Sequence, residues 1–178
     1  MVFNFKVCFM KALFIAVMFP VAVLGQTVHH QKNEIIYKGD VKLASLSTKD
    51  PMASLSNAVH VAGVEARAQF DSTSSGKVLA TKGTIGLNAP FRIIRNLHFT
   101  LTVSPQTAGY NYQVDSVFVT EKRRGGNETV KKSKELLDGI EDTGLRAVEA
   151  EKVLNEIDMR LQKLLAVMKR EMKKEQNK

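Results

Sequence analysis

Leu97-His-Phe-Thr-Leu-Thr-Val103 is the stretch that decides the fold of this chain. Every second residue in it is apolar: Leu97, Phe99, Leu101 and Val103. Because successive side chains of a strand point to opposite faces of a sheet, the pattern predicts a strand with one buried and one solvated face. One side of the sheet is therefore expected to carry the core, and the other to face water.

A second strand is expected directly after this one. A short turn spans 104–109, and apolar residues then alternate with polar ones over 110–115. Beyond Ser116 the apolar phase slips to Val117 and Val119, which indicates a β-bulge or a strand buried on both faces. The short turn makes the two strands antiparallel neighbours.

The region before this pair predicts a strand and a short helix. Residues 34–37 and 41–43 have the composition of a strand that begins the ordered part of the chain. Asp50-Pro51 then offers a helix N-cap followed by proline at the first helical position. Apolar residues recur at helical spacing, so a helix is expected over 50–60, ending near Gly63.

A β-hairpin is expected between this helix and the deciding strand. Residues 64–70 alternate, a polar turn occupies 71–76, and a returning strand begins over 77–82. The fold class is thus α+β, with an antiparallel sheet of about five strands.

The C-terminal part is predicted to be helical after a flexible break at Arg123-Arg-Gly-Gly-Asn127. A first helix is expected over 128–140 and a long one from about Gly144. The long helix carries one apolar stripe at three-and-four spacing: Leu154, Ile157, Leu161, Leu164, Leu165, Met168 and Met172. The stripe can pack on the buried face of the sheet, or it can extend beyond the domain as a coiled coil or lie on a lipid surface.

The first 25 residues have the composition of a secretory signal peptide. Lys6 and Lys11 precede the apolar run 12–24, and Val23 and Gly25 place small side chains at the −3 and −1 positions of a cleavage site. A retained membrane anchor is the alternative, although this run is shorter than the ~20 residues that a span needs. We expect export to the periplasm or cell surface of a Gram-negative bacterium.

Cleavage would leave a single domain without thiols. Cys8, the only cysteine, would be removed, which excludes disulfides, thiol catalysis and thiolate metal sites in the mature chain. We expect a flexible segment over 26–33, one α+β domain over 34–172 and a charged tail over 173–178.

The basic balance of the chain does not point to nucleic acid. The formal net charge is +8, and the two signal-peptide lysines account for part of it. Acidic residues interrupt most of the basic clusters at 122–124, 131–134 and 169–174, as on a solvated surface. These clusters also lack the interleaved aromatic residues on which single-stranded nucleic acid stacks.

The four histidines, His29, His30, His60 and His98, lie outside any catalytic motif. His98 is expected on the polar face of its strand, where a histidine is usually just a solvated surface residue. His29 and His30 would bind copper or nickel if cleavage left His29 third from a free amine. That cleavage would leave Gln26 at the −1 position, which signal peptidases disfavour.

Two further groups of residues are candidates for a site. Carboxylates cluster where the first C-terminal helix is expected to end: Asp138, Glu141 and Asp142. Their polar, lysine-rich surroundings favour simple solvation. Three aromatic residues would line a ligand groove or, at strand spacing, form core and cross-strand pairs: Tyr110, Tyr112 and Phe118. We expect no catalytic, cofactor-binding or metal-binding residues.

The order of elements resembles a domain of unknown function from small exported proteins of Bacteroidetes, described as having a TBP-like fold. The resemblance rests on Gln69-Phe-Asp-Ser-Thr-Ser-Ser-Gly-Lys77, His98-Phe-Thr-Leu-Thr102 and Tyr110-Asn-Tyr-Gln113, and it extends from about Ile35 to Met168. The chain departs by lacking tryptophan in the first helix and by its Gly125-Gly126 loop. The resemblance implies an antiparallel sheet with helices on one face, and no activity.

We therefore expect a non-enzymatic exported domain that acts as a protein-interaction or envelope-associated module, through its sheet surface or its C-terminal helix. The alternative is a protein that binds a small molecule or a lipid surface with a groove between sheet and helix. An exposed stripe of Leu161, Leu165 and Met168 would favour a protein partner or a membrane. A groove lined by polar atoms would favour a ligand. After cleavage of the signal segment no membrane contact is expected.

Overall fold

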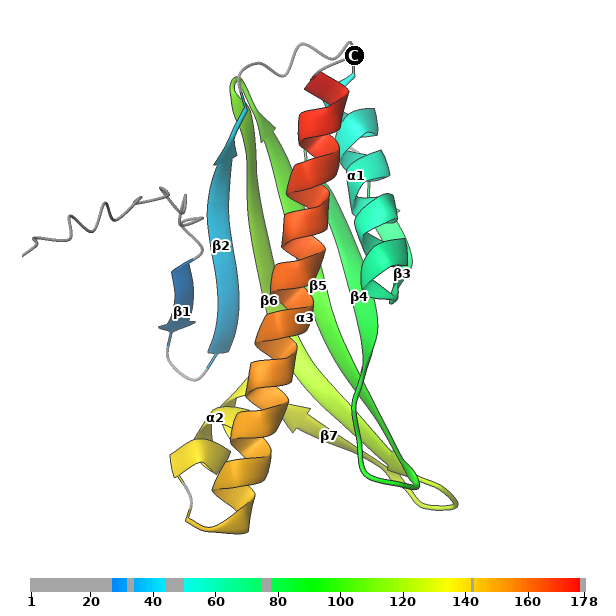
Figure 1. Ribbon diagram of the computed structural model, residues 1–178, viewed down its shortest axis with the longest axis vertical. Helices are drawn as coiled ribbons and strands as arrows, with labels where there is room; N and C mark the ends of the chain where they lie inside the picture. Colours follow the sequence, from blue (N-terminus) through cyan, green and yellow to red (C-terminus); the bar gives the residue numbers. More distant parts are fainter. Residues whose placement is uncertain (1–26, 32–33, 44–49, 75–77, 142, 177–178) are drawn as a thin grey trace, which may run out of the picture.

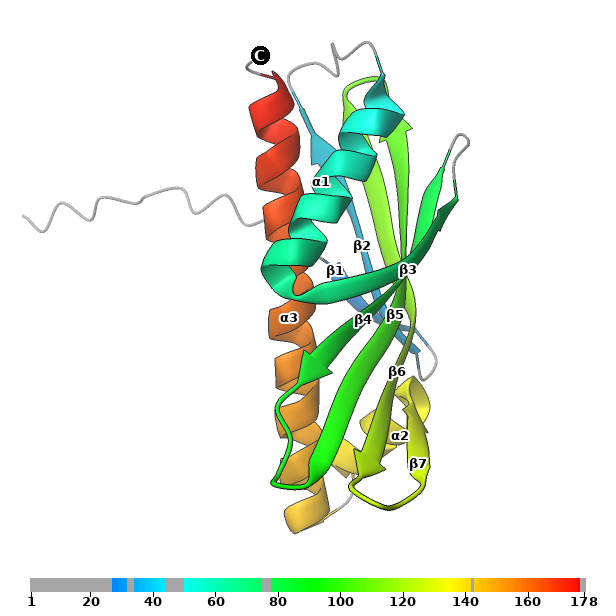
Figure 2. The same ribbon diagram turned by 90° about the vertical axis from the view of Figure 1, so that its right-hand side faces the viewer.

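A computed structural model describes residues 27–31, 34–43, 50–74, 78–141 and 143–176. They form an antiparallel sheet with two helices on one face, so the α+β class is confirmed (Figures 1 and 2). The strands are β1 (Thr27–Gln31), β2 (Glu34–Lys42), β3 (Ala68–Ser74), β4 (Leu79–Leu87), β5 (Ile93–Gln106), β6 (Gly109–Arg123) and β7 (Glu128–Lys132). The helices are α1 (Pro51–Ala66), α2 (Ser133–Glu141) and α3 (Leu145–Gln176). The predicted signal peptide lies outside the described residues.

The strand order is β1-β2-β6-β5-β4-β3, and β7 pairs with β6. The hairpin of β5 and β6 forms the centre of the sheet, and the alternation predicted for 97–103 is confirmed. All four of its apolar side chains are no more than 2% exposed, whereas the polar residues between them are half-buried on the other face. Gly109 closes the turn with a φ of +139°, and a Cβ there would lie 1.8 Å from the carbonyl oxygen of Val41. Only glycine fits this close approach to β2.

The phase slip in β6 is a β-bulge, as one of the two sequence interpretations predicted. His98 pairs with Phe118 and Thr100 pairs with Asp115, so β6 contains one more residue than β5 over the same interval. Ser116, inside this interval, has a left-handed φ of 53°. An extra residue bends a strand and increases its twist. The direction of β6 therefore changes at this point.

Helix α1 begins as predicted but ends later. The Asp50 Oδ1 atom accepts hydrogen bonds from the backbone N–H groups of Met52 and Ala53, each 3.0 Å long. The helix continues to Ala66 and ends at Arg67, which has a left-handed φ of 56°. The predictions of a strand from 64 and of a helix end at Gly63 are therefore wrong. Ala62 and Ala66 are buried in the core, so the apolar face of α1 continues into the residues whose alternation indicated a strand.

Residues 128–132 form strand β7, so the prediction of a helix over 128–140 is wrong for its first five residues. The predicted break at 123–127 is the turn of a hairpin between β6 and β7. Helix α2 begins at Ser133, whose hydroxyl donates a 2.6 Å hydrogen bond to the carbonyl oxygen of Val117. Main-chain pairing with β6 decides the local structure here, because the sequence of β7 has no strong periodicity.

Residues 27–31, within the segment predicted to be flexible over 26–33, form strand β1. This strand pairs with β2 from Thr27↔Lys38 to Gln31↔Glu34. A polar composition does not exclude a strand at the edge of a sheet, because the pairing uses main-chain groups.

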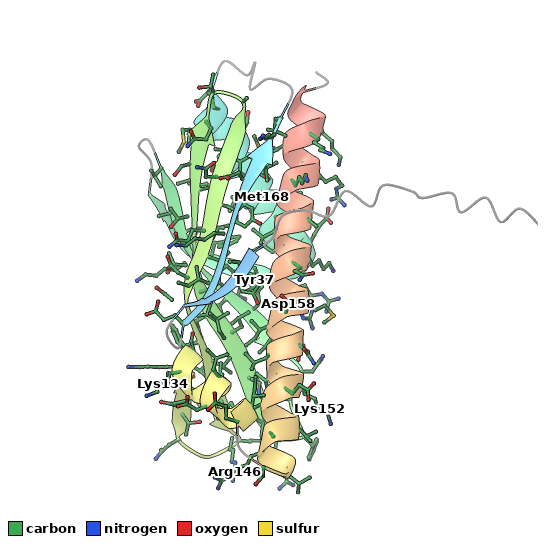
Figure 3. The ribbon with its side chains drawn as sticks, turned by 90° about the vertical axis from the view of Figure 1, so that its left-hand side faces the viewer. Tyr37, Lys134, Arg146, Lys152, Asp158 and Met168 are labelled. Carbon is green, nitrogen blue, oxygen red and sulfur yellow. The ribbon has the colours of Figure 1, made fainter. Side chains whose placement is uncertain are left out.

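The long helix α3 packs along the sheet, as one of the two sequence interpretations expected (Figure 1). Leu161, Leu165 and Met168 are buried in the core, beside the buried residues of α1 and of the central strands. Figure 3 shows Tyr37 of β2 facing Asp158 of α3. Burial, and then the charge and hydrogen bond of Asp158, raise the pKa of Tyr37 well above its usual value.

Helix α3 extends to Gln176 and so includes part of the predicted tail over 173–178. In the described part of the chain, no helix combines the length and apolar character required to span a bilayer.

Candidate functional site

Among the described residues, no helix lies over the central strands on the sheet face opposite α1 and α3 (Figure 2). We call it the open face. It is polar along β4, β5 and β6, where its side chains include Lys82, Thr84, Asn96, His98, Thr100, Thr102, Asn111 and Gln113. The alternation of apolar and polar residues in β5 predicted such a solvated face.

His98 lies at the centre of the open face, and both of its ring nitrogens have partners. Nδ1 is 3.1 Å from the hydroxyl oxygen of Thr84, and Nε2 is 3.1 Å from that of Thr120. The ring stacks on Phe118 with a centroid distance of 4.7 Å and an interplanar angle of 10°. His98 is therefore a half-buried cross-strand contact. It is not the freely solvated histidine that the sequence led us to expect.

The three candidate aromatic residues separate into two groups. Tyr110 and Tyr112 are buried in the core between sheet and helices, as their strand spacing favoured. Burial, with a smaller effect from Tyr112, raises the pKa of the Tyr110 hydroxyl well above its usual value. Phe118 follows the bulge, faces the open side and lines a groove.

This groove lies where β2 and β7 diverge along the same edge of β6. β2 pairs with β6 no further than Tyr37↔Val114, and β7 begins its pairing at Phe118↔Lys132. The bulge occupies the interval between these two pairs. The resulting space, which we call the fork groove, has a volume of about 760 Å³.

The fork groove combines an apolar surface with charged residues. Ile36, Phe118 and Val130 supply apolar surface from β2, β6 and β7. Four charged residues also line it: Glu34, Asp115, Lys132 and Lys134.

The charged residues of the fork groove differ in availability. Asp115 is already engaged, because it accepts hydrogen bonds from the Gln113 amide at 2.6 Å and the Ser116 hydroxyl at 3.0 Å. Neither Lys132 nor Lys134 forms an ion pair with another residue of the described ranges. Beside its apolar surface the groove thus presents two lysines without an ion pair in the described ranges, together with the negative charges of Glu34 and Asp115.

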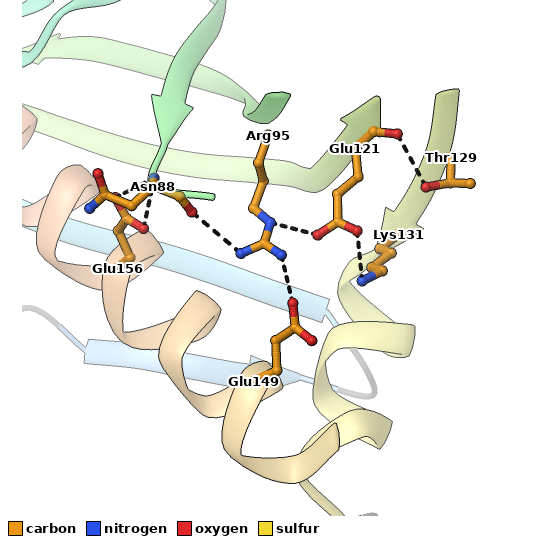
Figure 4. Close-up of polar contacts among 7 residues, drawn as sticks. All are labelled: Asn88, Arg95, Glu121, Thr129, Lys131, Glu149 and Glu156. Atoms are coloured by element: carbon orange, nitrogen blue, oxygen red, sulfur yellow. Dashed lines mark hydrogen bonds and ion pairs between the residues drawn. The ribbon is translucent and has the colours of Figure 1, made fainter. Parts of the chain in front are cut away.

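A second groove, of about 490 Å³, lies between the β4–β5 loop and the first turns of α3. Arg95 lines it and is buried there (Figure 4). Its Nε atom lies 2.5 Å from Glu121 Oε1, its Nη2 atom 2.8 Å from Glu149 Oε1, and its Nη1 atom 3.4 Å from the carbonyl oxygen of Asn88. All three guanidinium nitrogens are used within the protein, so this arginine is not a free anion site.

Glu121 links the same network to β7, since Lys131 Nζ lies 3.0 Å from its other oxygen. Burial alone would raise the pKa of Glu121, but Lys131 and Arg95 together outweigh it and hold the pKa below the usual value. The network ties β5, β6, β7 and α3 together. Its geometry indicates a structural ion cluster.

The remaining candidates do not converge on a site. His60 lies on the exposed side of α1, and Asp138 and Glu141 are exposed on α2. Asp142 and the side chains of His29 and His30 lie outside the described residues. Within the described ranges, no three potential metal ligands group together.

Two solved structures with the same fold are of proteins from Bacteroidetes. A TBP-like protein from Parabacteroides distasonis aligns with a TM-score of 0.52 and 8% identity, over 79% of this chain and 96% of its own. A DUF4468 family protein from Bacteroides ovatus aligns with a TM-score of 0.51 and 9% identity, over 79% of this chain and 90% of its own. The chain has a TBP-like fold. The fold that the sequence resemblance implied is thereby confirmed.

No protein-family model matches the chain, and no curated protein does. At 8–9% identity, the similarity to these TBP-like structures extends to the fold alone. The function must therefore be inferred from the surface of this chain.

Proposed function

We propose that this protein is an exported, non-enzymatic interaction module that binds a partner protein through the open face and the fork groove. The observation that carries the proposal is the uncovered polar face with a groove where β2 and β7 diverge from β6. Both helices that cover the sheet lie on the other side (Figure 2). The open face is thus the large surface of the sheet that the described residues leave uncovered.

The C-terminal helix is a weaker candidate for this role than the sheet. Leu161, Leu165 and Met168 are buried in the core, so they are not available to a partner or a membrane in the folded protein. The outward side of α3 is mainly charged and polar. Its exposed large apolar residues are Met159, which is isolated, and Leu145 and Val148 at the start of the helix. Single exposed apolar residues are common on protein surfaces and mark no interface.

The composition of the fork groove supports a particular chemistry for the bound segment. An apolar side chain would fill the space beside Phe118 and Val130, and a neighbouring carboxylate would pair with Lys132 or Lys134. Apolar contact supplies most of the affinity in such a site, and charge pairing sets the orientation. Because Glu34 and Asp115 line the same groove, the carboxylate of the bound segment would lie beside Lys132 and Lys134 and away from these two residues.

Site-specific photo-crosslinking in the native envelope tests this proposal. A photoreactive amino acid replaces Val130 in the groove or, as the matched control, Met159 on α3. The two residues are similarly exposed, at 52% and 55%. We expect one discrete protein adduct at Val130 that is absent at Met159, and that Lys132→Glu with Lys134→Glu abolishes. Equal labelling at both positions, or an adduct unaffected by charge reversal, would contradict the proposal.

A small-molecule ligand is a second candidate occupant of the same groove. Its volume of about 760 Å³ lies within the roughly 300–1,000 Å³ of known ligand sites. Native mass spectrometry of protein purified from its own envelope distinguishes the two. A bound mass below about 1 kDa that is lost in the Lys132→Glu, Lys134→Glu variant would favour the ligand.

A further inference from the structure

Two loops form a single tip at one end of the molecule. The β4–β5 loop (88–92) and the β6–β7 loop (124–127) lie at the end opposite the C terminus of α3 (Figure 1). The backbone N–H of Arg124 donates a 2.9 Å hydrogen bond to the carbonyl oxygen of Arg92, and Ile93 pairs with Arg123. We define the loop tip as these loops with the adjoining strand ends: Phe91, Arg92, Ile94, Lys122, Arg123 and Arg124.

The loop tip exposes large apolar side chains that the core does not use. Phe91 is 88% exposed and Ile94 is 63% exposed. The guanidinium carbon of Arg92 lies 5.4 Å from the centre of the Phe91 ring, which places a cation against an aromatic face. An exposed aromatic ring with an adjoining cation is the arrangement found at the boundary between lipid headgroups and acyl chains.

Folding alone does not explain arginine at position 92. Its φ of 71° is in the left-handed region, which glycine adopts without steric cost and other residues do not. The sequence already places glycine at a comparable position in the neighbouring loop, where Gly125 has a φ of 78°. Arg92 thus adopts a backbone conformation that glycine would adopt at lower steric cost, as Arg67 and Ser116 also do.

The charge of the loop tip is strongly one-sided. Arg92, Lys122, Arg123 and Arg124 are exposed. The adjoining carboxylates are Glu128, opposite Lys122 in the pairing of β6 with β7, and Glu121, which Arg95 and Lys131 already pair. None of these four cations forms an ion pair with another described residue. Arg95, Lys131, Arg160 and Arg170 are paired, whereas Lys132 and Lys134 of the fork groove are unpaired within the described ranges, like the cations of the loop tip.

We propose that the loop tip docks on an anionic lipid surface, with Phe91 inserted at the headgroup level and the four cations paired with lipid phosphates. Polybasic segments with exposed aromatic residues bind such surfaces by combined charge attraction and shallow burial. A protein partner fits less well, because a stable interface buries about 800 Å² on each side and needs a broader surface than two loop ends. This site shares no residue with the fork groove, so each can fail without the other.

Vesicle co-sedimentation tests this proposal with the full chain, exported by a bacterial host so that it carries the N terminus that processing leaves. The probes are vesicles of pure phosphatidylcholine and of equal parts phosphatidylcholine and phosphatidylglycerol. We expect binding to the anionic vesicles that weakens when salt rises from ~0.1 to ~1 M, since the Debye length falls from ~10 to ~3 Å. Each cation near the surface should strengthen binding about fivefold.

Variants of the loop tip give the decisive comparison. Arg123→Ser with Arg124→Ser should weaken binding roughly 25-fold, on the basis of about fivefold for each cation. The matched control is Lys173→Ser with Lys174→Ser. It removes the same charge from the C-terminal end of α3, at the other end of the molecule from the loop tip, and should change binding less than twofold. Arg92→Gly should weaken binding about fivefold while leaving the urea midpoint unchanged or raised, because glycine relieves the left-handed φ. Phe91→Ser should weaken binding on the order of tenfold without a change in fold.

Three results would overturn the proposal. The first is vesicle binding that does not change with phosphatidylglycerol content, with salt concentration or in the tip variants. A retained N-terminal anchor would produce this result. The second is equal loss of binding in the control and tip variants. The third is wild-type dimerisation that Phe91→Ser abolishes in sedimentation velocity, with no vesicle binding, because the tip would then serve a second copy of the chain.

Discussion

Replacing Arg95 by methionine should destabilise the protein strongly. The substitution removes the guanidinium of β5 that pairs with Glu121, so the charge of Glu121 stays buried without this partner. The Arg95 side chain is 5% exposed and that of Glu121 is 15% exposed. Breaking a buried ion pair by removing one partner costs ~3–5 kcal/mol. Because Lys131 still contacts Glu121, we expect the lower part of that range, about 3 kcal/mol.

Two companion variants separate the buried pair from its exposed neighbour. Glu149 also bonds to Arg95, but its side chain is 57% exposed, so Glu149→Gln should cost less than ~1 kcal/mol. The double variant Arg95→Met with Glu121→Leu should recover most of the loss, since apolar side chains of similar size often replace a buried pair without net cost. Urea unfolding followed by far-ultraviolet circular dichroism measures all three.

The reasoning would be refuted if Arg95→Met cost no more than Glu149→Gln. It would also fail if the double variant were as unstable as Arg95→Met alone. Either result would mean that the aliphatic stem of Arg95, and not its charge, stabilises this end of the sheet.

Three further predictions concern the pH dependence of stability, the β5–β6 turn at Gly109 and the N-cap of α1. The folded pKa of Glu121 is lowered, so its stabilisation is present above the unfolded value of about 4.3 and is lost as pH falls through the folded value. The urea midpoints of wild type and Glu121→Gln should therefore converge below about pH 4.3, and a constant difference would contradict this. Gly109→Ala should cost more than about 3 kcal/mol or prevent folding, because a Cβ meets the Val41 carbonyl; a thermal melt like that of wild type would show that the turn can shift. Asp50→Ala should cost about 1 kcal/mol through loss of two N-cap hydrogen bonds, and Asp50→Asn, which retains an acceptor, should cost less in the same melts.

Local patterns predicted the parts of the fold that depend on local chemistry. The alternation over 97–103, the phase slip at Ser116 and the N-cap at Asp50 each follow from the residues themselves. The apolar stripe of α3 is also predicted by the sequence. Periodicity alone leaves open whether the helix packs on the sheet or projects beyond the domain. Packing against α1 and the sheet decides that alternative.

The parts that could not be predicted depend on tertiary contacts. Residues 64–66 alternate like a strand, but the burial of Ala66 against the core keeps them in α1. Strand β7 forms because the edge of β6 beyond the bulge is available for pairing. No pattern within residues 128–132 predicts this pairing. The fork groove has the same origin. It exists because two strands far apart in the sequence share one edge of β6.

The affinity of the partner captured at Val130 shows most directly whether the fork groove is a binding surface. Isothermal titration calorimetry compares wild type with Lys132→Glu, Lys134→Glu and with the equal charge change at the far end of α3, Lys173→Glu, Lys174→Glu. We predict that the groove variant binds at least tenfold more weakly, which corresponds to ~1.4 kcal/mol, whereas the α3 variant binds like wild type. Equal affinities for all three proteins would contradict the claim that the partner occupies the fork groove.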